Sequence, residues 1–431
     1  MVKKREQFGW AMYDFANSGY TTVVLTAIYN TYFVSVVASE YESGLATFLW
    51  TIAIAISNGL VLLSAPLVGA IADYSNNKKS FLMLTTIGCV LFTSLLFFTK
   101  QGDVTLAIIL IILSSMMFYS GENIIAAFLP EISNESNIGK ISGFGWALGY
   151  FGGLLVLVLC LAYVSWGQAQ NQSAEQFIPV TLLIVSFCFA LASIPTFVWL
   201  KELGPRKEKP AHTSYAKIGY ERLKHTWQHA HHYRDLFRFL ITLTVFYCGI
   251  NTVIVLAAVY AQEVMNFQIE DTIKLIIVVN ITAAIGALLF GLIQDRIGAC
   301  KTQSITLYLW IIAMLLAYFT SSEIMFWVVA NLIGLALGAS QSAGRALIGL
   351  FSPKNRHGEF FGLWGLAIKL SAIIGPLSYG LITFITQGDH KVALLSTTIF
   401  FIAGLILLYS VNESRGREAA KLDENVNNSS S

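Results

Sequence analysis

Two similar stretches decide the fold of this chain: "GLIQDRIGACK" at Gly291–Lys301 and "GAIADYSNNKK" at Gly69–Lys79. Each follows a long apolar run and places an aspartate, Asp295 or Asp73, four residues after a glycine. A glycine lets two helices approach closely, and an aspartate can bind a helix N-terminus or a basic residue across a loop. One such loop could be a solvated connection between spans. Two copies, 222 positions apart, indicate an internal repeat whose acids lock one conformation.

The apolar runs around these loops have the length of membrane spans. Of the 431 residues, 55% are hydrophobic and 12% charged, whereas soluble proteins carry about a quarter charged residues. A bilayer core of ~30 Å needs roughly 20 apolar residues per helix. The sequence therefore predicts an all-α membrane protein with twelve transmembrane helices, arranged as two six-helix halves. The predicted spans are 12–37, 45–71, 80–99, 104–128, 142–164, 177–199, 236–261, 272–293, 303–320, 324–350, 360–385 and 391–411.

A second repeat supports the division into halves. "ISGFGWALG" opens the fifth span and "FFGLWGLAI" the eleventh, so that Gly143 and Gly362 lie 219 positions apart. We expect an N-terminal half at 1–199, a cytoplasmic linker at 200–235, a C-terminal half at 236–411 and a disordered tail at 412–431. Two repeated six-helix halves are typical of transporters that bind substrate between the halves and work by alternating access.

The distribution of charge predicts the orientation. Most lysines and arginines lie in the N-terminal tail, the linker, the C-terminal tail and the loops after spans 2, 4, 8 and 10. By the positive-inside rule both termini are cytoplasmic. The net charge of +2 argues against a nucleic-acid partner. Short loops without targeting extensions favour a bacterial inner membrane, and we expect a monomer.

Motifs for catalysis or cofactors are missing from the sequence. There is no G-x-x-x-x-G-K-[ST] nucleotide loop and no H-E-x-x-H pair within a span, so we expect no enzyme activity, no cofactor and no metal site. The linker stretch "ERLKHTWQHAHH" leaves one alternative open. Glu221, His225, His229 and His232 could bind zinc on one helix face, or the stretch could form an amphipathic helix on the membrane surface.

The two repeated loops resemble the signature loop of the major facilitator superfamily, G-x-x-x-D-(R/K)-x-G-x-(R/K)-(R/K). The copy at 291–301 keeps Gly291, Asp295, Arg296, Gly298 and Lys301, whereas the copy at 69–79 has Tyr74 where a basic residue is usual and Asn76 in place of the second glycine. The resemblance implies a conformational lock at the cytoplasmic ends of the helices. Its expected residues are Gly69, Asp73, Gly291, Asp295 and Arg296.

Three further stretches carry a narrower resemblance: "WAMYDFANSGYTT" at 10–22, "FLPEISNESNIGKISGFGWALGYFGG" at 128–153 and "QSAGRALIGLFSPKNRHGEFFGLWGLAIKLSAIIGPL" at 341–377. Together they are similar to the branch that includes the autophagy-related vacuolar amino-acid effluxers and their bacterial relatives. This resemblance implies a secondary transporter of small organic solutes, with neutral amino acids as the expected cargo. Another cargo, such as a metal chelate, drug or peptide, and a non-transporting solute sensor are the alternatives.

Four charges inside predicted spans are candidates for a functional role: Asp14, Glu122, Arg345 and Lys369. In the fold that the resemblance implies, spans 1, 4, 7 and 10 line the cavity, so we expect the first three to face it. Two acids and two bases can pair without net charge. They form a fixed ionic lattice, a gate that breaks when the cytoplasmic side opens, or a site for substrate and a coupling proton. Of the two acids, Glu122 is the expected proton carrier.

Uncharged polar residues near these acids complete the candidate site. Asp14, Asn17 and Ser18 repeat at helical spacing in the first span, which suits a helix that borders a water-filled pathway. Asn123 follows Glu122 in the fourth span. We expect Asn17 and Asn123 in the substrate or coupling site, although hydrogen bonding between helices is the commoner role of such residues.

Overall fold

The apolar runs form helices, because a chain in lipid has to satisfy its backbone hydrogen bonds internally. The computed structural model describes residues 4–202, 214–228, 231–267 and 269–429, and none of these residues forms a β-strand. The helices are α1 (Lys4–Gly19), η1 (Tyr20–Ala27), α2 (Tyr29–Tyr32), η2 (Phe33–Val37), α3 (Ser43–Ser75), α4 (Lys78–Leu95), η3 (Leu96–Phe98), α5 (Val104–Ala126), α6 (Leu129–Ile132), α7 (Ile138–Ala169), α8 (Ala174–Trp199), α9 (Tyr215–Gln228), α10 (Arg234–Met265), α11 (Ile269–Ile297), α12 (Ala299–Phe319), α13 (Glu323–Phe351), η4 (Lys354–Arg356), α14 (His357–Ile385), α15 (His390–Ser396), α16 (Thr398–Leu408) and α17 (Glu413–Ser429).

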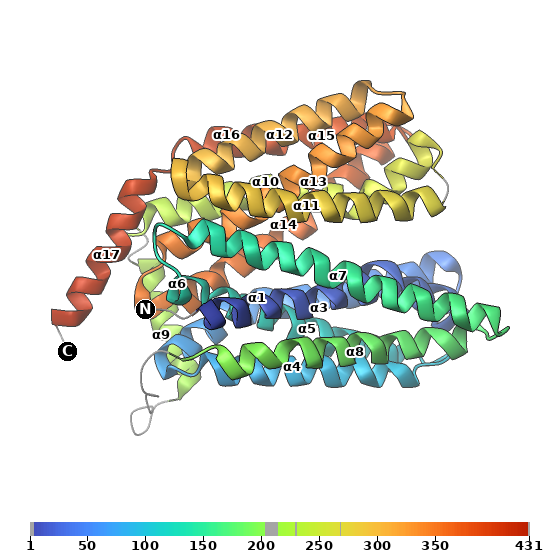
Figure 1. Ribbon diagram of the computed structural model, residues 1–431, viewed down its shortest axis with the longest axis horizontal. Coiled ribbons are helices and arrows are strands. Elements are labelled where there is room, and N and C mark those ends of the chain that lie inside the picture. The colour runs from blue at the N-terminus through green and yellow to red at the C-terminus, as the bar shows by residue number, and fades with distance from the viewer. Residues whose placement is uncertain (1–3, 203–213, 229–230, 268, 430–431) are drawn as a thin grey trace. The chain divides into compact units, whose positions relative to one another are not determined.

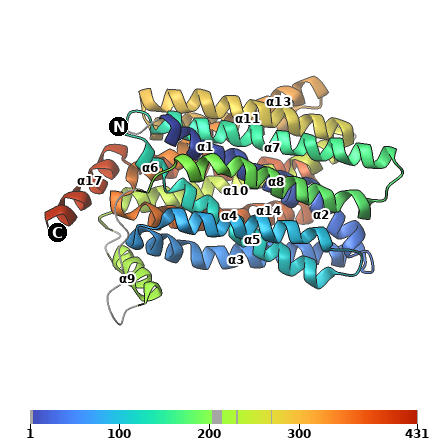
Figure 2. The ribbon, with the colours of Figure 1, turned by 60° about the horizontal axis from the view of Figure 1, so that its bottom comes forward.

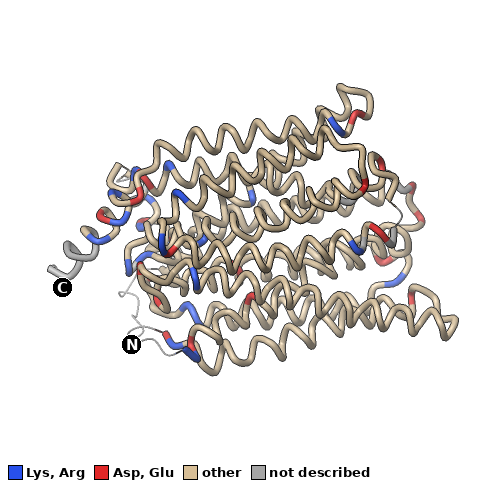
Figure 3. Tube along the Cα trace, turned by 45° about the horizontal axis from the view of Figure 1, so that its top comes forward, with Lys and Arg blue, Asp and Glu red and all other residues tan. Residues whose placement is uncertain are grey.

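The prediction of twelve membrane spans is confirmed for the described residues. The first span combines α1, η1, α2 and η2, the fourth combines α5 and α6, and the last combines α15 and α16. Acidic and basic residues lie mostly near the helix ends, and few lie along the middle of the helices (Figure 3). This pattern suits helices whose central turns lie in hydrocarbon.

The chain separates into two compact units. Unit 1 contains residues 1–65, 75–126 and 148–208, and unit 2 contains 66–74, 127–147 and 209–431. Unit 2 therefore holds the whole of the predicted second half together with two short pieces of the first: the end of α3, and the segment from α6 into the start of α7. The division into halves at 199 and 236 stays a prediction.

Unit 1 is held together by hydrogen bonds between its first span and its neighbours. Trp10 Nε1 donates to the carbonyl oxygen of Ile125 on α5 at 2.7 Å. One turn later the Tyr13 hydroxyl meets that of Thr86 on α4 at 2.9 Å. Buried polar groups in a membrane protein need such partners. The first span is thus fixed against α4 and α5, the helix that carries Glu122.

Unit 2 has its closest helix contacts where glycines face a neighbouring backbone. A Cβ on Gly338 of α13 would lie 1.8 Å from the carbonyl oxygen of Ala283 on α11. A Cβ on Gly375 of α14 would lie 2.1 Å from the carbonyl oxygen of Cys248 on α10. Small residues allow such approach between membrane helices. The pairs α11 with α13 and α10 with α14 therefore depend on glycine at these positions.

Two expectations need correction. The first helix begins at Lys4 rather than near residue 12, so its first turns are polar and precede the apolar run. The tail after 412, which we expected to be disordered, forms helix α17. Its sequence has few apolar residues, and ion pairs with Asp235 and Glu135 supply the contacts that hydrophobic burial would otherwise give. The linker does contain a helix, α9.

Candidate functional site

Asp73, the acid of the first repeated loop, binds the N-terminus of α14. Its two carboxylate oxygens accept hydrogen bonds from the backbone N–H groups of Gly358 and Glu359 at 2.9 and 2.8 Å. These are the second and third residues of α14, whose N–H groups have no partner within the helix. The negative carboxylate also interacts favourably with the positive end of the helix dipole. Asp73 is 6% exposed, so both bonds are shielded from water.

Asp295, the acid of the second loop, makes the same contact with α7. Its oxygens accept from the backbone N–H groups of Gly139 and Lys140, both at 2.9 Å. Gly139 and Lys140 are again the second and third residues of their helix. Both contacts lie within unit 2. The sequence repeat therefore corresponds to a repeated structural device: one acid capping one helix of the other predicted half.

Glycines allow these caps to form. A Cβ on Gly69 would lie 2.0 Å from the carbonyl oxygen of Gly358, and one on Gly143 would lie 2.2 Å from that of Ala287 on α11. Real side chains do not tolerate contacts this short, so the backbones would have to separate. Gly291 corresponds to Gly69 in the repeat, and a Cβ there would lie 2.6 Å from the Gly139 carbonyl oxygen. Both glycines therefore lie at the close contacts beside the two caps, as the expected lock requires.

The departures of the first loop from the superfamily pattern are accommodated. Asn76 stands where the second copy has Gly298, and both have a positive φ, 48° and 96°. Asparagine adopts the left-handed conformation more readily than most residues, so the chain still turns between the two helices. Tyr74 occupies the position of Arg296, which is exposed. The cap by the acid is therefore kept without the neighbouring basic residue.

A buried ionic cluster lies beside the Asp73 cap. Glu359, fully buried, receives two hydrogen bonds of 3.0 Å from Arg356, and Arg222 of α9 lies 3.8 Å away. Thr226 of α9 also hydrogen-bonds Glu359, and Arg356 donates to the Tyr233 hydroxyl at 2.9 Å. Buried charges are tolerated when paired and hydrogen-bonded in this way. The linker helix is thereby attached to the start of α14.

Arg345, expected in the candidate site, binds the start of α7 in unit 2. Its guanidinium donates to the carbonyl oxygen of Ser142 at 2.9 Å and to the Ser142 hydroxyl at 3.3 Å. The same guanidinium lies 5.0 Å from the ring centre of Trp146, within the range of a cation–π contact. Arg345 is 3% exposed. It ties α13 to the helix that Asp295 caps.

Lys369, the second base of the expected cluster, is also buried in unit 2. It lies on α14 and is 7% exposed. Two residues later, Ser371 accepts a hydrogen bond of 2.9 Å from the Asn251 amide on α10. Lys369 therefore lies two residues from a polar side-chain contact between α10 and α14.

The two acids of the expected cluster lie in unit 1. Asp14 is buried in α1, and Glu122 is half-buried in the neighbouring α5. The contacts of Trp10 and Tyr13 fix these two helices to each other. Because the bases Arg345 and Lys369 belong to unit 2, the ionic cluster of all four residues stays a prediction.

The two candidate asparagines are buried as well. Asn17 is 6% and Asn123 is 7% exposed. Among the described residues, the Asn123 Nδ2 has no hydrogen-bond partner. An unpartnered buried amide is costly, and this group can still donate a hydrogen bond.

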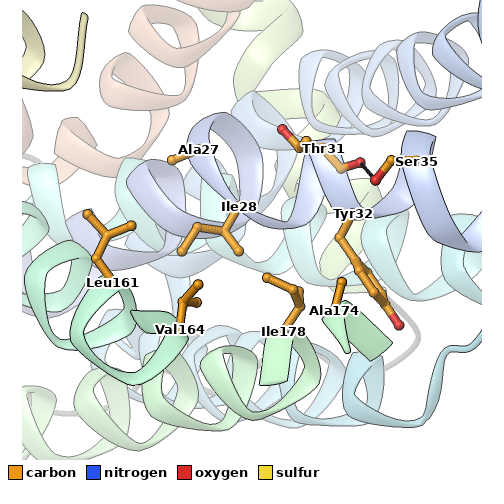
Figure 4. A pocket seen from close by; sticks show the side chains of 9 residues that line it. All are labelled: Ala27, Ile28, Thr31, Tyr32, Ser35, Leu161, Val164, Ala174 and Ile178. Carbon is orange, nitrogen blue, oxygen red and sulfur yellow. Dashed lines mark hydrogen bonds between the residues drawn. The ribbon is translucent and has the colours of Figure 1, made fainter. Parts of the chain in front are cut away.

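The first span is irregular directly after these polar residues. Segments η1 and η2 are π-helical, which widens the turn and is frequent at functional sites. Beside them lies a hollow of about 230 Å³, lined by Ala27, Ile28, Thr31, Tyr32, Ser35, Leu161, Val164, Ala174 and Ile178 (Figure 4). Its lining has no charged side chain, so it offers nothing to a coupling ion.

No group of three metal-ligating side chains is present among the described residues. The zinc site that the linker sequence leaves open is not tested by this result, because the His225 side chain and residue 229 lie outside the described residues.

Sequence reasoning missed the partners of the predicted residues. The caps are formed with main-chain N–H groups, which carry no side-chain pattern. A signal was nevertheless present: Gly139 and Gly358, which the two acids bind, are also 219 positions apart. The ion pair of Arg356 with Glu359 was not predicted, because the first half has no corresponding pair and the pattern is therefore not repeated.

Comparison with known proteins shows the family. The family model "Vacuole effluxer Atg22 like" matches residues 46–421. The MFS-type transporter YxiO of Bacillus subtilis is 26% identical over 98% of both chains. Autophagy-related protein 22 of Yarrowia lipolytica is 27% identical over 73% of this chain, which spans 57% of that relative.

Solved structures show the same fold at low identity. The proton:xylose symporter XylE has a TM-score of 0.72 at 14% identity, covering 98% of both chains. A bacterial homologue of the iron transporter ferroportin in an outward-facing state has a TM-score of 0.71 at 11% identity, over 95% of this chain and 99% of that one. With the family match and twelve spans among the residues that the structure describes, this chain belongs to the Atg22-like family and is a multi-pass membrane transporter of the MFS type.

Proposed function

We propose that this protein is a secondary active transporter that moves a small organic solute, a neutral amino acid, by alternating access coupled to protons. The observation that carries the proposal is the matched pair of caps, Asp73 on α14 and Asp295 on α7. Each cap joins the last turns of a helix of one predicted half, α3 or α11, to the start of a helix of the other. Such contacts can hold the cytoplasmic end closed in one state and have to break in the next.

The predicted site residues then fall into two groups. Gly69, Asp73, Gly291, Asp295 and Arg296 act in conformational locking. The six residues Asp14, Asn17, Glu122, Asn123, Arg345 and Lys369 act in substrate binding or coupling. In this proposal Arg345 closes the cytoplasmic gate through Ser142 and releases it on opening.

The proposed coupling proton is carried by Glu122. A half-buried carboxylate that loses a basic partner during the cycle favours its protonated form, because its charge is then poorly solvated. When the partner returns, the proton leaves. Transport and proton movement are thereby linked without nucleotide hydrolysis.

The cargo is proposed from the family. The matched family model is described as a vacuole effluxer, and autophagy-related protein 22 is among the curated relatives. Few charges lie within the spans, which favours a cargo without strong net charge. We further propose cytoplasmic termini, from the positive-inside distribution, a bacterial inner membrane and a monomer.

The experiment is uptake of a panel of labelled amino acids into proteoliposomes, with and without an imposed pH gradient. Glu122→Gln is compared with Glu263→Gln, an exposed acid at the end of α10 that serves as the matched control. We expect saturable uptake that the gradient stimulates, lost in Glu122→Gln and kept in the control.

Each part of the proposal has its own refuting result. An uptake rate that is the same with and without the pH gradient would contradict proton coupling. Absence of uptake by folded, inserted protein would contradict the amino-acid cargo and direct the search to metal chelates, drugs, peptides or a sensor role.

A further inference from the structure

Helix α17 follows the last span and lies at the same end of unit 2 as α9 (Figures 1 and 2). Its first turn is attached to the second predicted half. The Glu413 carboxylate accepts from the backbone N–H of Cys300 at 2.9 Å, at the N-terminus of α12. Arg415 forms a two-bond ion pair with Asp235 of α10, at 2.5 and 2.7 Å. Paired bonds of this kind between guanidinium and carboxylate are strong and directional.

Packing strengthens this attachment. Gly416 faces the fully buried ring of Phe351 at the end of α13, and a Cβ there would lie 2.6 Å from the ring. Ala420, one turn later, is 5% exposed. The small residues on this face let α17 lie close to α13. The N-terminal part of α17 is therefore a fixed extension of the second half.

The next turns of α17 reach a loop of the first predicted half. Lys421 Nζ lies 2.6 Å from Glu135 Oε1, and Arg417 lies 3.5 Å from Glu135 Oε2. The Lys421 hydrogen bond holds the pKa of Glu135 below its ordinary value. Glu135 belongs to the short connection between α6 and α7, three residues before α7 begins. That is the helix whose N-terminus Asp295 caps.

We propose that α17 is an electrostatic latch that holds the loop before α7 against the second half and releases it when the cytoplasmic end opens. The inference rests on the proposed alternating access. The two ends of the latch differ in character. The Asp235 side chain is 3% exposed, whereas that of Glu135 is 49% exposed. Because exposed ion pairs are weak and screened by salt, the contact that breaks is the one at Glu135.

The test measures the conformational equilibrium directly, so it does not depend on knowing the cargo. Spin labels are placed at Ser136, in the loop, and at Ser410, after α16, both exposed. The background replaces the half-buried Cys188 and Cys300 by serine. Distances are measured by double electron–electron resonance in lipid nanodiscs. Glu135→Gln is compared with Glu418→Gln, an exposed acid of α17 that is not in an ion pair of the described residues.

We expect Glu135→Gln to raise the long-distance population about two- to fivefold, the range for losing exposed ion pairs, and Glu418→Gln to leave it unchanged. A disulfide between cysteines introduced at Glu135 and Lys421 should abolish that population until it is reduced. Equal populations in Glu135→Gln and Glu418→Gln, or a long-distance population that survives the disulfide, would overturn the latch. Failure of amino-acid uptake alone would contradict the cargo and leave these distances as they are.

Discussion

Removing the Asp73 carboxylate should open the proposed lock at the start of α14. Asp73→Ala leaves the N–H groups of Gly358 and Glu359 without their acceptor in a site that is 6% exposed. Asp73→Asn keeps one side-chain acceptor and loses the charge. The substitution therefore separates the hydrogen bonds of the cap from its interaction with the helix dipole.

The expected magnitude follows from the two contributions. Loss of an N-terminal cap costs ~0.5–2 kcal/mol, and loss of a negative charge at a helix N-terminus costs ~0.3–1 kcal/mol. Together they give about 1–3 kcal/mol. Since ~1.4 kcal/mol is a factor of ten, Asp73→Ala should raise the population of the open cytoplasmic state roughly 5- to 100-fold, and Asp73→Asn should raise it less.

The assay is the rate of maleimide labelling of a cysteine introduced at Ser75, which is 6% exposed and lies two residues beyond Asp73. Cys188 and Cys300 are replaced by serine to remove the partly exposed native thiols. Asp271→Ala is the control, because it removes an acid from the start of α11, at the other end of that helix from Asp295. Labelling at an unchanged rate in Asp73→Ala would refute the assignment of this contact as a lock.

Three further outcomes are expected. Gly143→Val should destabilise the folded protein and lower its melting temperature in detergent, because even a Cβ would lie 2.2 Å from the carbonyl oxygen of Ala287; an unchanged melting temperature would contradict the close contact. Arg345→Ala should cost about 1–3 kcal/mol of the closed state by removing bonds to Ser142, seen as faster labelling at Ser75, with Arg345→Lys intermediate. The Glu135 contact should be independent of pH between 5 and 8. Because its pKa in the folded protein is lowered, its contribution is fully present above the ordinary carboxylate value of ~4.3 and is lost as the pH falls through the lowered pKa. In an acid titration the spin-label distances of the native sequence should stay constant from pH 8 to pH 5 and change only below the ordinary value, whereas those of Glu135→Gln should not show this change.

The spans and the positions of the two capping acids could be predicted because each has a pattern in the sequence. Hydrophobic runs identify membrane helices, and a repeated glycine and aspartate identify the two loops. Asp73 and Asp295 both bind helix N-termini, which is one of the two contacts that the sequence leaves open for these acids. The sequence indicated that each acid has a partner. It did not indicate which helix each acid binds, because every helix offers the same main-chain N–H donors at its N-terminus.

Other features lacked such a mark. Helix α17 has the composition of a disordered tail, and its stability depends on partners distant in sequence, such as Asp235. The π-helical turns of the first span arise within an ordinary apolar stretch. Arg345 was identified as buried and charged, but its contact with Ser142 depends on which helices pack together. These are tertiary properties, and local pattern does not determine them.

The two caps have the same geometry but different access to solvent, and this sets the order in which they come apart. Asp73 is 6% exposed and lies next to the Arg356–Glu359 pair, whereas Asp295 is half-buried. Mobile ions therefore reach the Asp295 contact more easily and weaken it first as ionic strength rises. We therefore expect rising salt to weaken the contact at α7 before the contact at α14.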